Sequence, residues 1–302
     1  MTSNYTITVL GLGAMGLPMA TRLASELTVH GFDIAEPRLK LAEEAGIRTF
    51  ASAREASKGA DALLLAVRNG EQLGDVLFGE NGVASVLKPG AVVILGSTVG
   101  TEPIPATVDR LAEYGVELVD APLSGGPKRA GEGDLLIVVG ASPEAQEKAR
   151  PALELLASTL TVVGDKPGDG QALKTVNQLL CGVHIAAAAE AFSLAGKAGI
   201  DRRILLEILS GSAASSWMLK DRGPRMLEDE PRVASAVDIF VKDLGLVLDA
   251  GRAGKAALPL AAAAHQMFLA ASGLGHGGAD DSQVLRAYRA LNEEPLSRTG
   301  EG

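Results

Sequence analysis

The feature that most constrains the fold is a glycine pattern after the first apolar run of the chain. Residues 7–16 read ITVLGLGAMG, a run of strand character that leads into Gly11, Gly13 and Gly16. In a strand–turn–helix unit the first glycine permits a tight turn, the second lets backbone approach a pyrophosphate, and the third lets the helix pack closely on the strand. The pattern therefore predicts a dinucleotide-binding unit. The residues of this turn expected to bind the cofactor are Gly11, Leu12, Gly13, Ala14 and Met15.

An acidic residue follows at the spacing that such a unit requires. Asp33 ends the next expected strand, 17 residues after Gly16, where a carboxylate accepts hydrogen bonds from the adenosine ribose. A carboxylate there also repels a 2′-phosphate, and the next residue, Ile34, is not an arginine that would bind one. We therefore expect the cofactor to be NAD rather than NADP.

Short apolar runs alternate with helical patterns in the first half of the chain, and the pattern changes near residue 165. A run such as LLLAV at residues 63–67 is typical of a parallel strand covered on both faces. The turn-rich stretch KPGDG at residues 166–170 follows, and the rest of the chain shows helical segments. The sequence predicts an α/β fold, with a Rossmann-like doubly wound parallel sheet for dinucleotide binding at 1–164. An all-α domain for substrate binding and oligomerisation is expected at 165–302.

The expected elements follow from these runs. The expected strands are Thr6–Leu10, Leu27–Phe32, Ile47–Phe50, Ala62–Val67, Ala91–Leu95, Val116–Val119, Leu135–Val139 and Thr161–Val163. The helices expected in the first domain include Pro18–Glu26, Glu36–Ala45, Ile104–Tyr114 and Pro143–Ala157. The helices expected in the second domain are 171–198, Arg202–Ser210, Ser215–Leu227, Val237–Ala253, Pro259–Ala271 and Ser282–Leu291. The last ten residues are polar and are expected to fray.

Composition narrows the range of partners. The formal net charge is −9, and no Lys/Arg-rich run offsets it, so we expect no nucleic acid partner. The least polar stretch, residues 179–200, contains His184, Glu190 and Lys197, so it is expected to be a buried helix and not a membrane span. One cysteine and four scattered histidines form no ligand pattern, so no metal site is expected. With no visible secretory signal, a cytoplasmic protein is expected.

A second motif follows a β-run in the middle of the chain. Residues 120–130 read DAPLSGGPKRA, with Ser124 directly before Gly125 and Gly126. Two glycines after a serine leave backbone N–H groups and a hydroxyl free to face an anion, which suits a substrate carboxylate. A flexible loop without a ligand is the alternative interpretation of this motif taken alone.

A third motif opens the long helix at residues 168–178, GDGQALKTVNQ. Lys174, Asn177 and Gln178 are spaced i, i+3, i+4 and therefore share one helix face. A lysine with two amides beside it can position a hydroxyl and exchange its proton, whereas a solvated polar stripe is the alternative. The other side of this helix is apolar and is expected to be buried through Val176, Leu179, Leu180 and Val183.

The three motifs, in this order and spacing, resemble the β-hydroxyacid dehydrogenase family, which includes 3-hydroxyisobutyrate dehydrogenases and tartronate semialdehyde reductases. The resemblance runs from Gly11 to about Leu248 and includes GLGAMGLPMA, DAPLSGGPKRAGEGDLLIVVG, GDGQALKTVNQ and FVKDLGLVLDA. It implies hydride transfer between NAD and a small hydroxy acid that carries a carboxylate. It also implies that Lys174 is the catalytic residue, and that the protein is a homodimer or homotetramer.

The resemblance implies further site residues. The substrate-binding residues expected are Ser124, Gly125, Gly126, Asn177 and Gln178. The cofactor-binding residues expected outside the glycine turn are Asp33, Val67, Arg68, Thr98 and Lys242. Of these, Thr98 and Lys242 would lie beside the nicotinamide.

The chain also departs from the common pattern of that family. Gln178 replaces the second asparagine of Lys-x-x-Asn-Asn, and residues 67–69 read Val-Arg-Asn where many members have Leu-Pro-Asn. Both changes resemble the L-threonate dehydrogenase branch and favour a four-carbon sugar acid over 3-hydroxyisobutyrate as substrate. That branch typically has histidine where this chain has Asn177, which bears on the substrate but not on the reaction class.

Two other functions fit part of the pattern. A non-catalytic dinucleotide-binding protein would explain the glycine turn, but it gives no reason for Lys174 with its amide neighbours. An imine-reducing enzyme on the same architecture would usually lack a lysine at this position and favour NADPH. Lys174 and Asp33 therefore both count against the second alternative.

Overall fold

The computed structural model describes residues 5–292. The chain divides into two compact units, Met1–Lys174 and Thr175–Gly302. One long helix, α8 (Asp169–Lys197), begins in the first unit and continues in the second. The polar last ten residues of the chain, which were expected to fray, lie outside the described residues.

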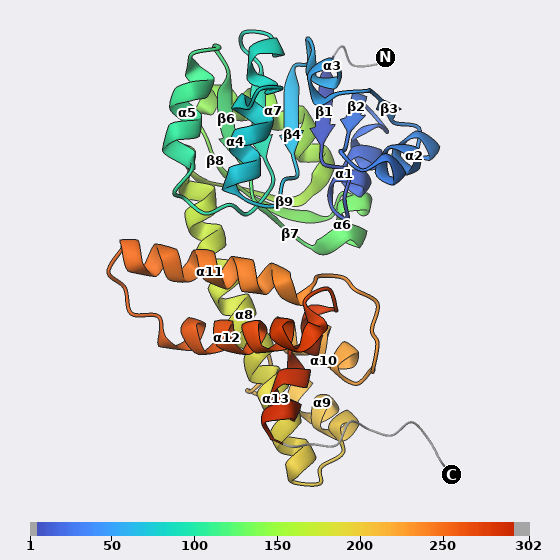
Figure 1. Ribbon diagram of the computed structural model, residues 1–302, viewed down its shortest axis with the longest axis vertical. Helices are drawn as coiled ribbons and strands as arrows, with labels where there is room; N and C mark the ends of the chain where they lie inside the picture. Colours follow the sequence, from blue (N-terminus) through green and yellow to red (C-terminus); the bar gives the residue numbers. More distant parts are fainter. Residues whose placement is uncertain (1–4, 293–302) are drawn as a thin grey trace. The chain divides into compact units, whose positions relative to one another are not determined.

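The first unit is built on a nine-stranded sheet in the order β3-β2-β1-β4-β5-β6-β8-β7, with β9 paired to β8 (Figure 1). Strands β1 to β6 are all parallel, whereas β8 runs antiparallel to β6 and β7. Strands β2 and β3 lie on one side of β1, and β4, β5 and β6 lie on the other. This doubly wound order leaves a crevice at the carboxyl ends of the strands. The strands are β1 (Thr6–Leu10), β2 (Thr28–Phe32), β3 (Arg48–Thr49), β4 (Ala62–Leu65), β5 (Val92–Leu95), β6 (Glu117–Asp120), β7 (Leu123–Ser124), β8 (Leu135–Gly140) and β9 (Ala157–Gly164).

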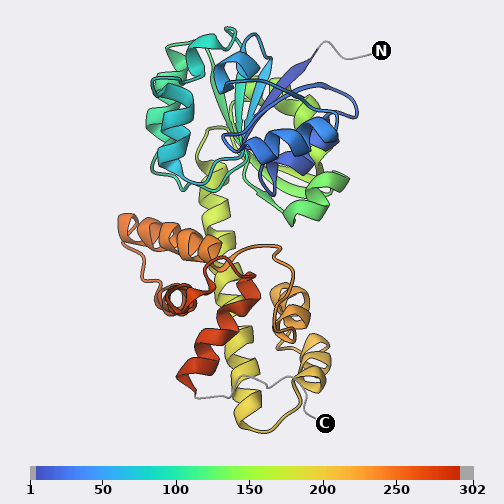
Figure 2. The same cartoon turned by 45° about the vertical axis from the view of Figure 1, so that its right-hand side comes forward.

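Helices cover both faces of this sheet. They are α1 (Gly16–Leu23), α2 (Glu36–Glu44), α3 (Ala53–Ser57), α4 (Gly70–Phe78), η1 (Ala84–Val86), α5 (Ile104–Ala112), α6 (Gly126–Glu132) and α7 (Pro143–Leu156). Alternate residues of β4 point to opposite faces, so Leu64 packs in the core with α1 and α7, and Leu63 packs in the core with α4 and α5. Figure 2 shows the helices on the two faces of the sheet. Since all four residues of β4 are buried, the strand is continuously apolar.

The second unit is helical. Besides the rest of α8 it contains α9 (Arg202–Ser210), α10 (Trp217–Met226), α11 (Val237–Ala253), α12 (Pro259–Ala271), η2 (Ser272–His276), η3 (Asp281–Val284) and α13 (Leu285–Leu291). Its core includes Phe240 of α11 stacked on Phe268 of α12, with ring centroids 5.1 Å apart. Gly182 of α8 lies so close to Leu244 of α11 that a Cβ would come within 2.8 Å of its side chain. A small residue at this position therefore lets α8 and α11 pack closely.

A buried ionic cluster links α10 to the segment before α13. Arg222 donates to both carboxylate oxygens of Asp281 over 3.0 and 2.8 Å, and Arg225 lies 2.7 Å from Asp280. The side chains of Asp280 and Asp281 are fully buried. Burial alone would lower the pKa of Arg222, but its contacts with Asp281 and Asp221 raise that pKa above its ordinary value. Burial raises the pKa of Asp281, and its hydrogen bonds and ion pair with Arg222 oppose that shift.

The structure confirms the predicted fold class and a strand at each of the eight expected places. It also contains short elements that the sequence pattern did not indicate, β7 and α6, and β9 begins at Ala157, four residues earlier than expected. The prediction for the apolar side of α8 is wrong in part. Val176 and Leu180 are 59% and 50% exposed, because the polar side of the helix faces α11 instead.

Candidate active site

The glycine turn joins β1 to α1, and its geometry excludes side chains at two of its glycines. Gly11 has φ +90°, and a Cβ there would lie 2.5 Å from the carbonyl oxygen of Ala66. A Cβ on Gly16 would overlap the carbonyl oxygen of Gly11. At Gly13, by contrast, no heavy atom of the described residues other than Gly13 and its chain neighbours lies within 4 Å of the Cβ position, so the backbone is open to a ligand there. These are the three roles that a pyrophosphate-binding turn requires.

The remaining residues of the turn differ in what they can offer. Leu12 is fully buried in the core, so only its backbone is available to a cofactor. Met15 is partly buried against the same core, and Ala14 is exposed. A contact between this turn and a dinucleotide would therefore be made mainly by backbone groups, as at other helix N-termini.

Asp33 closes the glycine turn against the end of β2. Its Oδ2 accepts the Leu12 N–H over 2.7 Å, and its Oδ1 accepts the Ala35 N–H over 2.9 Å. Each carboxylate oxygen has a second lone pair, so the group can still accept a ribose hydroxyl. Ile34, the neighbouring residue, is 92% exposed and offers no positive charge to a phosphate.

The loops after β4 and β5 carry the other predicted cofactor residues of the first unit. Because β1, β4 and β5 are adjacent and parallel, Val67, Arg68 and Thr98 lie along the same edge of the sheet as the glycine turn. Arg68 is exposed, and its backbone N–H donates to Gln72 Oε1 over 2.9 Å. The structure therefore places these three residues at the edge where doubly wound sheets bind their ligands.

Lys174 and Ser124 meet, although 50 residues separate them in the sequence. The Nζ of Lys174, on α8, donates to the Oγ of Ser124, at the end of β7, over 2.8 Å. Lys174 is only 8% exposed. Gly125 and Gly126 follow Ser124 with φ values of +144° and +77°, a backbone course that favours glycine. The predicted catalytic lysine thus lies beside the predicted carboxylate-binding loop.

Two buried residues of the first unit were not singled out from the sequence. The side-chain amide of Gln171 reaches Val99, Gly100, Ser97 and Asp120. Gln171 lies three residues before Lys174 on the same helix, and Asp120 ends β6. The position of Gln171 on the lysine face of α8 was the available signal, but its partners are far away in the sequence.

The carboxylate of Asp120 accepts hydrogen bonds from backbone N–H groups at the start of α8. Its Oδ2 accepts the N–H groups of Gly168 and Gln171 over 2.9 and 2.8 Å. Burial raises the pKa of Asp120, and the hydrogen bonds from Gln171, Gly168 and Gly170 oppose that shift. Asp120 therefore anchors the first turn of the helix that carries Lys174.

The other three predicted site residues lie in the second unit, and two of them, Gln178 and Lys242, contact Asp243. Gln178 donates to Asp243 Oδ2, and Lys242 forms an ion pair with Asp243 Oδ1 at 2.8 Å. Asn177 donates to Gln178 Oε1 over 2.9 Å. Asp243 is 3% exposed and was missed in the sequence, where it is one of many charged residues on helical segments. The structure thus brings Asn177, Gln178 and Lys242 into one hydrogen-bonded group.

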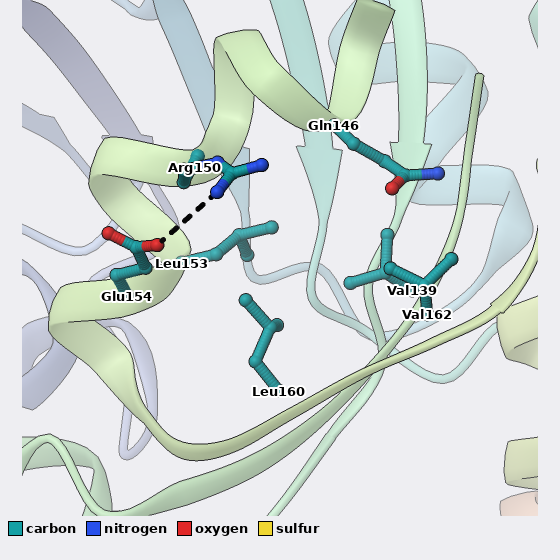
Figure 3. Close-up of a pocket in the computed structure, with 7 residues that line it drawn as sticks. All are labelled: Val139, Gln146, Arg150, Leu153, Glu154, Leu160 and Val162. Carbon is teal, nitrogen blue, oxygen red and sulfur yellow. Dashed lines mark ion pairs between the residues drawn. The ribbon is translucent and has the colours of Figure 1, made fainter. Parts of the chain in front are cut away.

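A cavity elsewhere in the first unit does not coincide with these residues. It has a volume of about 150 Å³ and lies between α7 and strands β8 and β9 (Figure 3). Its lining is Val139, Gln146, Arg150, Leu153, Glu154, Leu160 and Val162. Arg150 and Glu154 form an ion pair across 3.9 Å at its border. It contains none of the predicted site residues, so the site is defined by hydrogen-bonding groups and not by this cavity.

Comparison with known proteins identifies the family. Residues 6–164 match the model described as the NAD binding domain of 6-phosphogluconate dehydrogenase, and residues 168–288 match the model described as NAD-binding of NADP-dependent 3-hydroxyisobutyrate dehydrogenase. The chain is similar to L-threonate dehydrogenase of Cupriavidus necator, with 44% identity over 94% of this chain and 96% of that protein. It is 39% identical to L-threonate dehydrogenase of Pectobacterium atrosepticum over 96% of both chains.

A solved structure agrees with these matches. The crystal structure of a 3-hydroxyisobutyrate dehydrogenase from Salmonella typhimurium has a TM-score of 0.88 and 37% identity, and the match covers 94% of this chain and 99% of that one. The resemblance to the β-hydroxyacid dehydrogenase family, the reaction class and the Rossmann-like architecture are thereby confirmed. The chain belongs to the 3-hydroxyisobutyrate dehydrogenase-like family of β-hydroxyacid dehydrogenases and is an NAD-dependent hydroxy acid dehydrogenase.

Proposed function

We propose that this dehydrogenase acts on a four-carbon sugar acid such as threonate, with Lys174 as the acid/base group. The observation that carries the proposal is the 2.8 Å hydrogen bond from Lys174 Nζ to Ser124 Oγ, which joins the proton-exchanging group to the carboxylate loop. Relatives named L-threonate dehydrogenase, at 38–44% identity, support the substrate class. The polar residues Gln178 and Arg68 support a substrate with several hydroxyl groups.

Each residue of the site has a role in this proposal. Ser124, Gly125 and Gly126 hold the substrate carboxylate through a hydroxyl and backbone N–H groups. In oxidation, Lys174 takes the proton of the reacting hydroxyl on its neutral Nζ, and in reduction its ammonium returns that proton. NAD, when bound, supplies the hydride acceptor. Asn177 and Gln178 bind the hydroxyl groups of the substrate, so that one of them is oriented toward Lys174.

The first unit fits a dinucleotide. Gly13 leaves open space where a phosphate would approach, and Asp33 keeps lone pairs for a ribose. In our proposal the backbone of residues 11–15 binds the pyrophosphate, Val67 and Arg68 line the cofactor, and Thr98 lies beside the nicotinamide. Lys242 is assigned to the nicotinamide on the family resemblance.

The proposal also covers organisation and setting. We assign residues 1–164 to dinucleotide binding and 165–302 to substrate binding and oligomerisation; the two family models, at 6–164 and 168–288, support this division. We expect a cytoplasmic homodimer or homotetramer without nucleic acid or membrane partners. The exposed apolar residues Val176, Leu180 and Leu194 of α8 support self-association. The helix α8 is long and apolar enough to span a membrane, but 44% of its apolar 18-residue stretch is buried within the structure, which fits a core helix.

The test of the chemistry is Lys174→Met. A positioned general acid/base is worth about 10² to 10⁴ in rate, so kcat is expected to fall by that factor while folding and NADH binding change little. Methionine keeps the unbranched stem and the helix propensity of lysine. Lys58→Met, at an exposed lysine of the same unit, is the matched control and is expected to keep its kcat. A kcat within a few-fold of the parent protein in Lys174→Met would end the proposed mechanism.

The test of the substrate is a panel of C3 to C6 hydroxy acids, each assayed with NAD and with NADP. We expect turnover of threonate or one of its epimers to exceed that of 3-hydroxyisobutyrate, because a site built for hydroxyl groups rejects analogues that lack them. Good turnover of 3-hydroxyisobutyrate with none of threonate and its epimers would contradict the substrate assignment. If the enzyme turned over only cyclic imines, it would be an imine reductase and not a hydroxy acid dehydrogenase.

A further inference from the structure

The side-chain amide of Gln171 uses both its donors and both its acceptor positions inside the first unit. Its Oε1 accepts the N–H groups of Val99 and Gly100 over 2.9 and 3.1 Å. Its Nε2 donates to the carbonyl oxygen of Ser97 over 3.0 Å and to Asp120 Oδ1 over 2.8 Å. Gln171 is fully buried. An amide bound on both ends in this way cannot flip without losing several hydrogen bonds at once.

The partners of this amide belong to the segments that carry the proposed reacting groups. Thr98 lies within the loop after β5 that Gln171 holds at three backbone atoms. Lys174 lies three residues further along the same helix. Asp120 begins the segment that ends at Ser124, the hydrogen-bond acceptor of Lys174. One amide therefore connects the loop of Thr98, the helix of Lys174 and the strand end that leads to Ser124.

We propose that Gln171, held by Asp120, is a positioning residue that fixes the distance between the Thr98 loop and the Nζ of Lys174. This inference rests on the proposed function, in which Thr98 lies beside the nicotinamide and Lys174 exchanges the hydroxyl proton. Hydride and proton leave adjacent atoms of one substrate group, so both acceptors must be in range together. A displacement of 1 Å can cost about 10²-fold in rate. Because the buried Gln171 amide makes its hydrogen bonds to protein groups, we expect its effect to be on kcat and not on KM.

The test is a pair of variants that reverses and then restores the donor–acceptor match. Gln171→Glu keeps the size of the side chain but places an acceptor oxygen against the Ser97 carbonyl and the Asp120 carboxylate. Adding Asp120→Asn returns an N–H donor at that contact and keeps the summed charge of the two side chains. We expect Gln171→Glu to lower kcat by about 10- to 100-fold with the KM for NAD within about 3-fold. The double variant is expected to recover at least about 5-fold.

Two further readouts separate positioning from general damage. With substrate deuterated at the reacting carbon, Gln171→Glu is expected to show a larger isotope effect on kcat, since the hydride step becomes slower than product release. In the cofactor-free protein, Gln171→Leu is expected to speed amide hydrogen exchange at Val99 and Gly100, which lose their acceptor. Gln146→Glu, on α7, is the matched control, because it removes one hydrogen bond to the carbonyl of Ala141, which precedes that helix, and alters none of the proposed site residues.

The proposal is overturned by any of three results: kcat of Gln171→Glu within about 2-fold of the parent protein, an equal loss in Gln146→Glu, or no recovery in the double variant. Its failure is distinguishable from failure of the proposed function. If Lys174→Met is inactive and Gln171→Glu fully active, only the positioning role is lost. If Lys174→Met keeps its kcat, the proposed function is lost whatever Gln171 does.

Discussion

Asp33 combines a structural and a selective role at the residue scale. The carboxylate holds the glycine turn through Leu12 and is expected to face the ribose of the cofactor. Like charges in a partly desolvated site cost a few kcal/mol, so we predict about a hundredfold preference for NAD over NADP in kcat/KM. Asp33→Ala is expected to narrow this gap mainly by weakening NAD, because it also releases the Leu12 N–H.

The measurement is kcat/KM with each cofactor for the parent protein and the variant. Glu36→Ala removes an exposed carboxylate three residues away, which pairs with Lys40 at the surface, and is expected to leave the ratio unchanged. Equal efficiency of NAD and NADP in the parent protein would show that Asp33 does not select the cofactor.

Lys242 gives a second prediction for a single residue. Lys242→Met is expected to raise the KM for NAD and to lower kcat, in contrast to Lys174→Met, which should spare cofactor binding. The substitution also removes the ion pair of the buried Asp243 and leaves its hydrogen bond from Gln178, so the midpoint of thermal unfolding should fall. Titration of NADH fluorescence checks the first effect, with Lys220→Met, at an exposed lysine, as control. Unchanged NADH affinity would show that Lys242 does not bind the cofactor.

At the scale of elements, the contact between α10 and η3 depends on the buried pair of Arg222 and Asp281. Arg222→Met leaves the carboxylate buried beside Asp280 without its partner, so the free energy of unfolding is expected to fall by about 3–5 kcal/mol. Replacing both residues, by Arg222→Met with Asp281→Leu, is expected to cost less than Arg222→Met alone. Denaturant unfolding followed by circular dichroism measures both variants.

The exposed pair of Arg252 and Asp249, on α11, provides the control for the buried pair. Arg252→Met is expected to change the free energy of unfolding by about 0–1 kcal/mol, since exposed ion pairs contribute little. A loss in Arg222→Met no larger than that of the control would mean that the buried cluster does not hold α10 in place.

Most elements could be predicted from the sequence, because a buried parallel strand such as β4 is apolar throughout and the turns between strands and helices carry glycine. The short elements β7 and α6 could not, since Ser124, Gly125 and Gly126 have low propensity for either state and are ordered by tertiary contacts. Which side of α8 is buried could not be predicted from the sequence either. Asp243, 65 residues beyond Gln178, decides which side of that helix is buried.

The residues of the candidate site also differ in how far they could be predicted from the sequence. The glycine turn and Asp33 are recognisable because local spacing defines them. Lys174 and Ser124 could be named separately, but their contact spans 50 residues and follows only from the fold. Gln171 and Asp120 carry no local signal, because a glutamine in a helix and an aspartate at a strand end are common. Their importance comes from hydrogen bonds to distant backbone atoms.

At the scale of the whole molecule, the exposed apolar side of α8 leads to a prediction about assembly. We expect the protein to be a dimer or tetramer, and the double variant Val176→Lys/Leu180→Lys to dissociate more readily, because it places charges in an apolar contact. Sedimentation equilibrium measures the mass. Tyr114→Lys, a substitution of an exposed aromatic residue of the first unit, is the control and should keep the parental mass. A monomeric parent protein would contradict the prediction.

The division of the chain directly after Lys174 has a consequence for recombination between homologous genes. Both members of the Lys174–Ser124 contact are encoded upstream of that point, whereas Asn177, Gln178 and Asp243 are encoded downstream. A crossover at this junction would transmit Lys174 and Ser124 together, and it would replace in one event the two amides that we propose bind the substrate hydroxyl groups. Chimeric genes joined there are therefore expected to inherit their chemistry from one parent and their choice of acid from the other.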